Sequence, residues 1–295
     1  MQYVTLSNGV KMPQLGYGVY QVSKDECERC VFDALKVGYR HIDTAQSYFN
    51  EEEVGNAIKK SGIPREEIFL TTKVWIEHYG YEACRASVLE SLKKLQTDYI
   101  DLMLLHQPFS DYYGAWRALE DLYDEGKIRA IGISNFYPDR MIDLASFARI
   151  KPMVNQVETH PFNQQVEAQK WMEKYGIQIE AWAPFGEGRG GLFTNETIAE
   201  IGKKYDKSVA QVILRWELQR GIVVIPKSVH IERMEQNFNV FDFELSDEDM
   251  AVMASLDKRE SSFFSHQDPN MVEWFVKMVE ERKNNNDHKK EKKNW

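Results

Sequence analysis

The sequence has few cysteines, no long apolar run and no excess of positive charge. Cys27, Cys30 and Cys84 are too few for a disulfide framework and suit a reducing compartment. No apolar run is long enough to cross a bilayer, and the first residues lack the basic and apolar regions of a signal peptide. The formal net charge of −9 argues against a nucleic-acid partner. We therefore expect a cytoplasmic protein with neither a membrane nor a nucleic-acid partner.

The composition is that of a globular protein with a large core. Hydrophobic residues make up 43% of the 295 residues, which excludes disorder of the whole chain. Cys27 and Cys30 form a C-x-x-C, but a structural zinc needs a second ligand pair and a redox motif needs a thioredoxin-like context. We interpret the two cysteines as positions on one face of an early helix.

Short β-branched runs alternate with longer amphipathic stretches, which is typical of βαβ units around a parallel sheet. Eight runs are predicted to be strands, namely 15–21, 39–45, 68–74, 99–106, 128–135, 152–158, 177–183 and 222–228. The helical stretches between them include 23–37, 50–62, 81–95, 113–127, 165–176 and 208–221. Eight strands with intervening helices favour a closed α/β barrel, the (β/α)8 TIM barrel, over an open doubly wound sheet.

The two ends of the chain differ from this pattern. The first residues predict a β-hairpin with Asn8-Gly9 at its turn. Residues 282–295 are rich in lysine and asparagine, so we expect a polar tail that frays or extends the last helix. The domain organisation predicted is therefore a single barrel domain over 1–281 followed by this tail.

Polar side chains occur where several predicted strands end. Asp43, Lys73 and His106 each end a strand, and Tyr48 follows shortly after Asp43. In a barrel of this kind, active sites lie at the C-terminal ends of the strands. A lysine at the mouth of a packed barrel is costly unless it is paired. Each residue alone is most simply a local hydrogen-bonding group, but their occurrence together at one rim predicts a site.

These residue types suit carbonyl reduction, which needs a hydride donor and a proton donor. An unperturbed tyrosine has a pKa near ~10, and a neighbouring ammonium lowers it by favouring the phenolate. We therefore predict Tyr48 as general acid, with Lys73 and Asp43 as the pair that tunes it. His106 is predicted to hydrogen-bond and orient the substrate oxygen.

From residue 4 to residue 275 the sequence resembles the aldo-keto reductase superfamily. The segments that carry the resemblance are GYGVYQV, GYRHIDTAQSYFNEEEVG, FLTTKVW, DYIDLMLLHQP, GKIRAIGISNF, NQVETHPF, AWAPFGEG and IPKSVHIERMEQNF. Asp43, Tyr48, Lys73 and His106 match the catalytic tetrad of that family residue by residue. The ending FFSHQDPNMVEWF is similar to bacterial 2,5-diketo-D-gluconate reductase-like enzymes. The resemblance implies a monomeric oxidoreductase that uses NADPH to reduce aldehydes or ketones.

The resemblance also implies a cofactor site. Ser134, Asn135 and Gln156 would bind the nicotinamide carboxamide, and Trp182 would stack on the ring. Lys227 and Arg233 together suit a 2′-phosphate, which favours NADPH over NADH. The implied cofactor-binding residues are Gly18, Val19, Tyr20, Asp43, Ser134, Asn135, Gln156, Trp182, Ala183, Pro184, Phe185, Gly186, Lys227, Ser228, Val229, Arg233, Gln236 and Asn237.

The predicted substrate pocket is both aromatic and polar, which suits a small oxygenated or aromatic carbonyl compound. Its walls are predicted to be Tyr20, Phe49, Trp75, His106, Gln107 and the segment 261–269.

Three alternatives stay open. The glycine-rich run 186–191 satisfies G-x-G-x-x-G but follows the seventh strand, so it is no Rossmann fingerprint; it either covers the pyrophosphate or is simply flexible. A nucleotide-binding sensor or regulatory barrel with little turnover is a second function. A metal-dependent hydrolase or isomerase would use His41, Asp43, His106 and His160, but these form no H-x-H or carboxylate cluster, so we expect no metal.

Overall fold

The computed structural model describes the backbone of residues 1–291 and, in the last helix, side chains as far as residue 282. Within that range eight parallel strands follow one another in chain order, each hydrogen-bonded to the next. They are β3 (Tyr17–Gly18), β4 (His41–Asp43), β5 (Phe69–Val74), β6 (Leu102–Leu105), β7 (Ile131–Ser134), β8 (Val154–Glu158), β9 (Gln178–Trp182) and β10 (Val223–Val224). Each lies inside one of the eight predicted runs.

Backbone hydrogen bonds join the first strand to the last and close the barrel. The Gly16 amide donates to the Val224 carbonyl over 2.8 Å, and the Val224 amide donates to the Gln14 carbonyl over 2.9 Å. Leu15 and Val224 form a parallel bridge between the two edges. The predicted (β/α)8 barrel is confirmed, and closure leaves no unpaired sheet edge.

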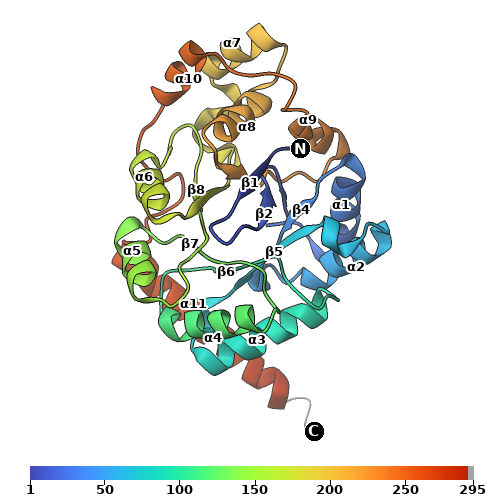
Figure 1. Ribbon diagram of the computed structural model, residues 1–295, viewed down its shortest axis with the longest axis vertical. Helices are drawn as coiled ribbons and strands as arrows, with labels where there is room; N and C mark the ends of the chain where they lie inside the picture. The colour runs from blue at the N-terminus through green and yellow to red at the C-terminus, as the bar shows by residue number, and fades with distance from the viewer. Residues whose placement is uncertain (292–295) are drawn as a thin grey trace.

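Helices surround the barrel, as Figure 1 shows. They are α1 (Lys24–Val37), α2 (Glu51–Ser61), α3 (Tyr81–Lys94), α4 (Tyr112–Asp124), α5 (Pro138–Phe147), α6 (Val166–Tyr175), α7 (Glu196–Tyr205), α8 (Val209–Gln219), α9 (Ile231–Phe238), α10 (Asp247–Ala254) and α11 (Pro269–Glu291). Local sequence sets several ends: Ser208 and Gln211 form a capping box that begins α8, and Gly176 ends α6 in the left-handed conformation. Cys27 and Cys30 are both buried on α1, as expected.

The predicted hairpin covers the N-terminal end of the barrel. Its strands are β1 (Tyr3–Thr5) and β2 (Lys11–Pro13), and Gly9 takes a φ of +88° at the turn. The Asn8 side-chain amide donates to the carbonyl of Arg129, just before β7 begins. This end of the barrel is therefore closed, and the opposite rim is left for a site.

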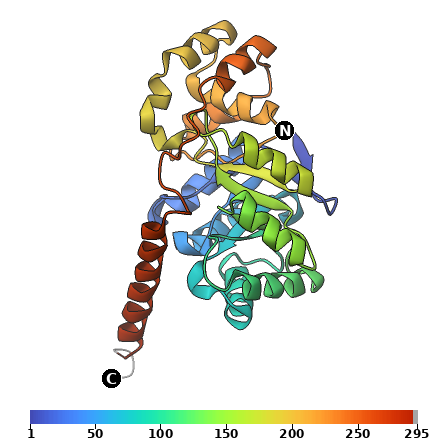
Figure 2. The same ribbon diagram turned by 90° about the vertical axis from the view of Figure 1, so that its left-hand side faces the viewer.

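The C-terminal helix α11 lies at the edge of the barrel, and its far end stands clear of the other helices (Figure 2). Phe275 buries its ring in the core, and Met271, Val272, Met278 and Val279 pack against the same cluster. Residues 282–291 of the predicted polar tail form the last turns of α11. Residues 292–295 of that tail lie outside the described residues.

Candidate active site

The four predicted catalytic side chains meet at the C-terminal rim of the barrel. Asp43 ends β4, Lys73 lies near the end of β5, and His106 follows β6 directly. Tyr48 lies in the short helix η1 (Gln46–Tyr48) that follows β4. The hydroxyl of Tyr48 lies 3.3 Å from Nζ of Lys73, and the rings of Tyr48 and His106 are 5.8 Å apart in an edge-to-face arrangement.

Lys73 is fully buried and has acceptors for all three of its protons. Nζ lies 2.6 Å from Oδ1 of Asp43, 3.0 Å from the carbonyl of Thr44 and 3.3 Å from the hydroxyl of Tyr48. Burial opposes its charge, but Asp43 and Tyr48 more than compensate, so the pKa of Lys73 is raised. The side chain is therefore an ammonium that is held in one orientation.

Tyr48 is protonated at neutral pH. Burial of the hydroxyl raises its pKa, while Lys73 lowers it, and the net pKa is raised to about 12. The ammonium acts in the expected direction, but the expectation that it lowers the pKa of Tyr48 below the ordinary value is wrong. Desolvation of the phenolate is the larger effect. A tyrosine that keeps its proton next to an ammonium is suited to give it up only to a base that forms beside it.

His106 is a neutral imidazole. Burial is the main cause that lowers its pKa well below the ordinary value, and the charge of Lys73 adds to it. Nδ1 lies 3.4 Å from the hydroxyl of Ser47, and the Trp75 ring packs edge to face at 5.1 Å. If Nδ1 accepts from Ser47, Nε2 carries the proton and is a donor for an oxygen held between His106 and Tyr48.

A continuous hydrogen-bond network links the predicted nicotinamide residues to this group. Nε2 of Gln156 donates to Oδ2 of Asp43 over 2.9 Å. Nδ2 of Asn135 donates to the His106 carbonyl over 3.0 Å, and Nε1 of Trp182 donates to Oδ1 of Asn135 over 2.9 Å. Ser134 donates to the carbonyl of Gln156 over 2.8 Å. The structure thus brings these four residues together beside the tetrad.

The residues predicted for the other end of the cofactor lie in the segment that follows β10 and in α9. Lys227, Arg233 and Gln236 are exposed, whereas Ser228 and Asn237 are buried. In the described part of the chain neither Lys227 nor Arg233 forms an ion pair, so Arg233 is not paired with Glu232 or Glu235. Two free cations beside a helix N-terminus fit a phosphate group.

The remaining predicted cofactor residues line the rim between these two groups. The amide of Gly18 donates to the Pro226 carbonyl over 3.2 Å, and a Cβ on Gly18 would come within 3.1 Å of the Ile225 carbonyl. Val19 donates to the carbonyl of Asp43 over 3.1 Å. The residues that follow β9 are Ala183, Pro184, Phe185 and Gly186, of which Ala183 and Gly186 have positive φ.

Four of the five predicted substrate residues gather around the rim. The ring of Tyr20 lies 5.1 Å from that of Tyr48, and Trp75 contacts His106 as described. Phe49 is 57% exposed, so its ring faces the solvent at the mouth. Gln107 differs, because its Oε1 lies 2.9 Å from Nε2 of His266. Its side chain is thus tied to the C-terminal segment.

The glycine-rich loop and the segment 261–269 meet over the rim. The loop forms η4 (Gly186–Thr194), with positive φ at Gly186, Gly188, Gly190 and Gly191. Arg189 donates to the Ser262 carbonyl over 3.1 Å and stacks over the Phe263 ring at 4.3 Å. The loop is therefore joined to a second segment at its tip.

Glu158 anchors the segment 261–269 to the end of β8. Its carboxylate accepts from the hydroxyl of Ser261 over 2.5 Å and from the amide of Ser262 over 2.7 Å. His160 Nε2 lies 2.8 Å from Glu158 and 3.2 Å from the Ser262 hydroxyl. Both partners contact the same nitrogen, so a proton cannot be relayed from one to the other through the ring. We therefore interpret these residues as a structural anchor.

Sequence reasoning missed several residues that support the site. The Gln46 side chain accepts from the Trp75 amide over 3.0 Å, and Ser47 contacts His106. Glu180 of β9 is fully buried, and burial together with the charge of Asp43 raises its pKa to about 8. The signal for Glu180 was a glutamate inside an apolar strand. Arg29 of α1 donates to the Val229 carbonyl, a contact between distant segments for which the sequence holds no signal.

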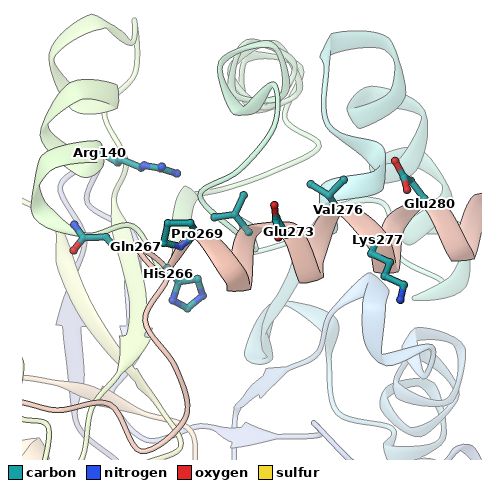
Figure 3. Close-up of a pocket in the computed structure, with 9 residues that line it drawn as sticks. Arg140, His266, Gln267, Pro269, Glu273, Val276, Lys277 and Glu280 are labelled. Carbon is teal, nitrogen blue, oxygen red and sulfur yellow. The ribbon is translucent and has the colours of Figure 1, made fainter.

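A separate groove of about 900 Å³ runs along α11 (Figure 3). It is lined by Arg140, His266, Gln267, Pro269, Val272, Glu273, Val276, Lys277 and Glu280, and by none of the tetrad. Among the described residues no group of three or more His, Cys, Asp or Glu side chains has a metal-binding arrangement. No described helix is both long and apolar enough to span a bilayer.

Comparisons with known proteins all point to one family. Residues 6–258 match the model of the aldo/keto reductase family. The chain is 52% identical over 259 residues to a glyoxal reductase of Bacillus subtilis, covering 87% of this chain and 93% of that protein. A crystal structure provisionally described as a 2,5-diketo-D-gluconic acid reductase B superposes with a TM-score of 0.86 at 40% identity, over 90% of this chain and 95% of the other. A Bombyx mori aldo-keto reductase in complex with NADP superposes with a TM-score of 0.85 at 34% identity, over 89% and 95% of the two chains.

Proposed function

The chain belongs to the aldo/keto reductase family, and from this premise we propose that it reduces small aldehydes or ketones to alcohols, with NADPH as hydride donor and Tyr48 as proton donor. The observation that carries the proposal is the contact of 3.3 Å between the Tyr48 hydroxyl and the Lys73 ammonium at the rim. The glyoxal reductase activity of the B. subtilis relative supports a small carbonyl substrate.

Each polar group has a defined part in this reaction. Nε2 of neutral His106 donates a hydrogen bond to the substrate oxygen and orients it between His106 and Tyr48. As negative charge develops on that oxygen, the Tyr48 proton moves to it. The Lys73 ammonium, held by Asp43, stabilises the phenolate that remains. Burial of the Tyr48 hydroxyl favours its neutral, protonated state before the reaction.

The residues at the rim fit an NADP cofactor. When bound, NADPH supplies a hydride. Ser134, Asn135, Gln156 and Trp182 would hold the nicotinamide end beside the tetrad. Unpaired Lys227 and Arg233 would hold a 2′-phosphate, which favours NADPH over NADH. The joined loop and segment around Arg189 and Ser262 would cover the pyrophosphate between them.

We also infer that the protein acts as a cytoplasmic monomer on small molecules. All three cysteines are free and buried, in keeping with a reducing compartment. The two other functions considered from the sequence, a sensor barrel and a metal-dependent hydrolase, have less support: the tetrad is complete, and the buried His41 and His160 are turned to protein partners.

The test is the variant Tyr48→Phe in a spectrophotometric assay with methylglyoxal and NADPH. We expect at least a hundredfold loss of kcat, since general acid catalysis typically contributes that much, with the affinity for NADPH retained. Tyr3→Phe, at an exposed tyrosine of the hairpin, is the matched control. Full turnover by Tyr48→Phe contradicts the proton-donor role, and NADPH binding without turnover of any carbonyl compound by the natural chain favours the sensor.

A further inference from the structure

The groove along α11 is separate from the candidate active site. Its volume of about 900 Å³ is within the range of small-molecule pockets in proteins. All its lining residues except Arg140 lie beyond residue 258, where the family match ends. The buried ring of Phe275 packs between the two sites, 6.4 Å from the ring of His266 in the groove and 6.0 Å from that of Trp75 at the rim. A molecule in the groove would therefore not reach the tetrad.

One end of the groove carries a cation with free hydrogen-bond donors. The guanidinium of Arg140 extends from α5 toward α11 (Figure 3). Its Nη1 donates to the carbonyl of Pro108, whereas Nε and Nη2 have no acceptor in the described part of the chain and remain accessible to solvent. Within the same part of the chain Arg140 forms no ion pair. An anion that enters the groove would therefore meet a guanidinium that is already held in place.

Farther along α11 the groove combines apolar and acidic side chains. Val272 and Val276 line it one helical turn apart, and Val276 is 53% exposed. Glu273 and Glu280 line the same stretch, and neither forms an ion pair with a described residue. Figure 3 shows Glu273, Val276 and Glu280 on one side of α11, and Lys277, which is paired within α11, on the opposite side. The groove is thus positive at one end and negative beyond its apolar middle.

We propose that this groove binds an elongated amphipathic molecule, with a carboxylate held by Arg140 and an apolar chain that lies along Val272 and Val276. The rise of an α-helix places Val272 and Glu280 about 12 Å apart, which sets the length of that chain. The planar guanidinium matches a carboxylate in geometry and charge, and the exposed valines gain from being covered. Glu273 and Glu280 disfavour a second negative charge at the far end of the molecule.

Calorimetric titrations with three ligands of equal chain length test this charge pattern. Decanoate carries one carboxylate, decanedioate carries two, and ω-aminodecanoate carries a carboxylate and an ammonium. We expect decanedioate to bind about threefold more weakly than decanoate, and ω-aminodecanoate to bind at least as tightly as decanoate. Arg140→Gln should weaken decanoate binding about tenfold, because a charge-assisted hydrogen bond is lost, and Arg140→Lys should retain part of the affinity. Arg117→Gln, at an exposed arginine of α4 outside the groove, is the matched control.

A further variant and a second measurement locate the bound molecule. Glu280→Gln should narrow the difference between decanedioate and decanoate, since one repelling charge is removed. With decanoate bound, hydrogen exchange should slow over 266–280 and stay unchanged over 46–50, next to the tetrad. Protection confined to 46–50, equal decanoate affinities of the natural chain and Arg140→Gln, or no binding of decanoate would each overturn the inference. These measurements need no turnover, so the inference and the proposed function fail or stand separately.

Discussion

Lys73 shows how one buried charge can organise a site. Its exposed fraction is 0%, and it lies in a strand whose other side chains are also buried. A lone ammonium there would be costly, so Asp43, the Thr44 carbonyl and the Tyr48 hydroxyl each accept one of its protons. Gln156 in turn holds the second oxygen of Asp43. The position of the Tyr48 hydroxyl is thereby fixed by groups that are themselves fixed.

Removing one partner of this pair should cost more than removing both. Lys73→Met leaves Asp43 buried without a counter-charge, and we expect it to lower the free energy of unfolding by about 3 kcal/mol. In the double variant Asp43→Asn/Lys73→Met the loss should be smaller than that of Lys73→Met alone. Urea unfolding at neutral pH measures both values.

Enzyme activity is a separate measurement on the same variants. Both should be inactive in NADPH oxidation, because neither stabilises the phenolate of Tyr48. Lys203→Met, in an exposed pair with Glu200, is the control and should change stability by less than about 0.5 kcal/mol. The single variant Asp43→Asn completes the cycle: a loss in the double variant equal to the sum of the losses in Lys73→Met and Asp43→Asn would show that Asp43 and Lys73 are not coupled.

Among the elements, the strands were predictable and the contacts between distant segments were not. Apolar runs that end in Asp43, Lys73 and His106 predict both the barrel and its active rim, because periodicity and a misplaced polar residue are local signals. The strands were predicted to be longer than they are, since β3 and β10 pair over only two residues each.

The segment that covers the rim shows the limit of sequence reasoning. The anchoring of Ser261 and Ser262 by Glu158 joins residues about a hundred positions apart, and no local pattern indicates it. The same holds for Arg282 of the predicted polar tail, whose Cζ lies 5.3 Å from the centre of the Trp75 ring. The family resemblance supplied residues near the cofactor but not this contact, because the family match ends at residue 258.

The loop η4 should become more mobile when its contact with the segment 261–269 is removed. Arg189→Ala removes the hydrogen bond to the Ser262 carbonyl and the contact with the Phe263 ring. We expect faster hydrogen exchange over 186–194 with little change in global stability, since the contact is at the surface. Mass spectrometry of exchanged peptides measures this. Lys170→Ala, which cuts a surface pair on α6, should leave exchange of the loop unchanged, and unaltered exchange in Arg189→Ala means that the loop is held by its own backbone.

For the whole molecule, buried titratable groups make stability depend on pH. Burial lowers the pKa of His41 to about 3 and that of His266 to about 4, and it lowers the pKa of His106 well below the ordinary value. These histidines stay neutral in the folded protein but take up protons when unfolded. Their folded pKa values are depressed, so the stability they contribute is present above about pH 6.5 and is lost as the pH falls.

Glu180 works in the opposite direction. Its folded pKa is raised to about 8, so its contribution is full below the unfolded value and is lost as the pH rises through about 8. Burial also raises the pKa of Glu217 well above the ordinary value and raises that of Glu51, so between about pH 4.5 and pH 6.5 three carboxyls oppose the three histidines. Each such group changes the slope of stability against pH by up to about 1.4 kcal/mol per pH unit.

The slope of stability against pH identifies the groups responsible. Between about pH 4.5 and pH 6.5 we expect His266→Asn to lower the slope of the free energy of unfolding in urea against pH by about one proton. Since His266 also holds Gln107 beside the site, its variant is compared at each pH with its own stability at pH 7.5. An unaltered slope would mean that His266 takes up its proton in the folded state, with Gln107 and the segment 261–269 moving to accommodate it.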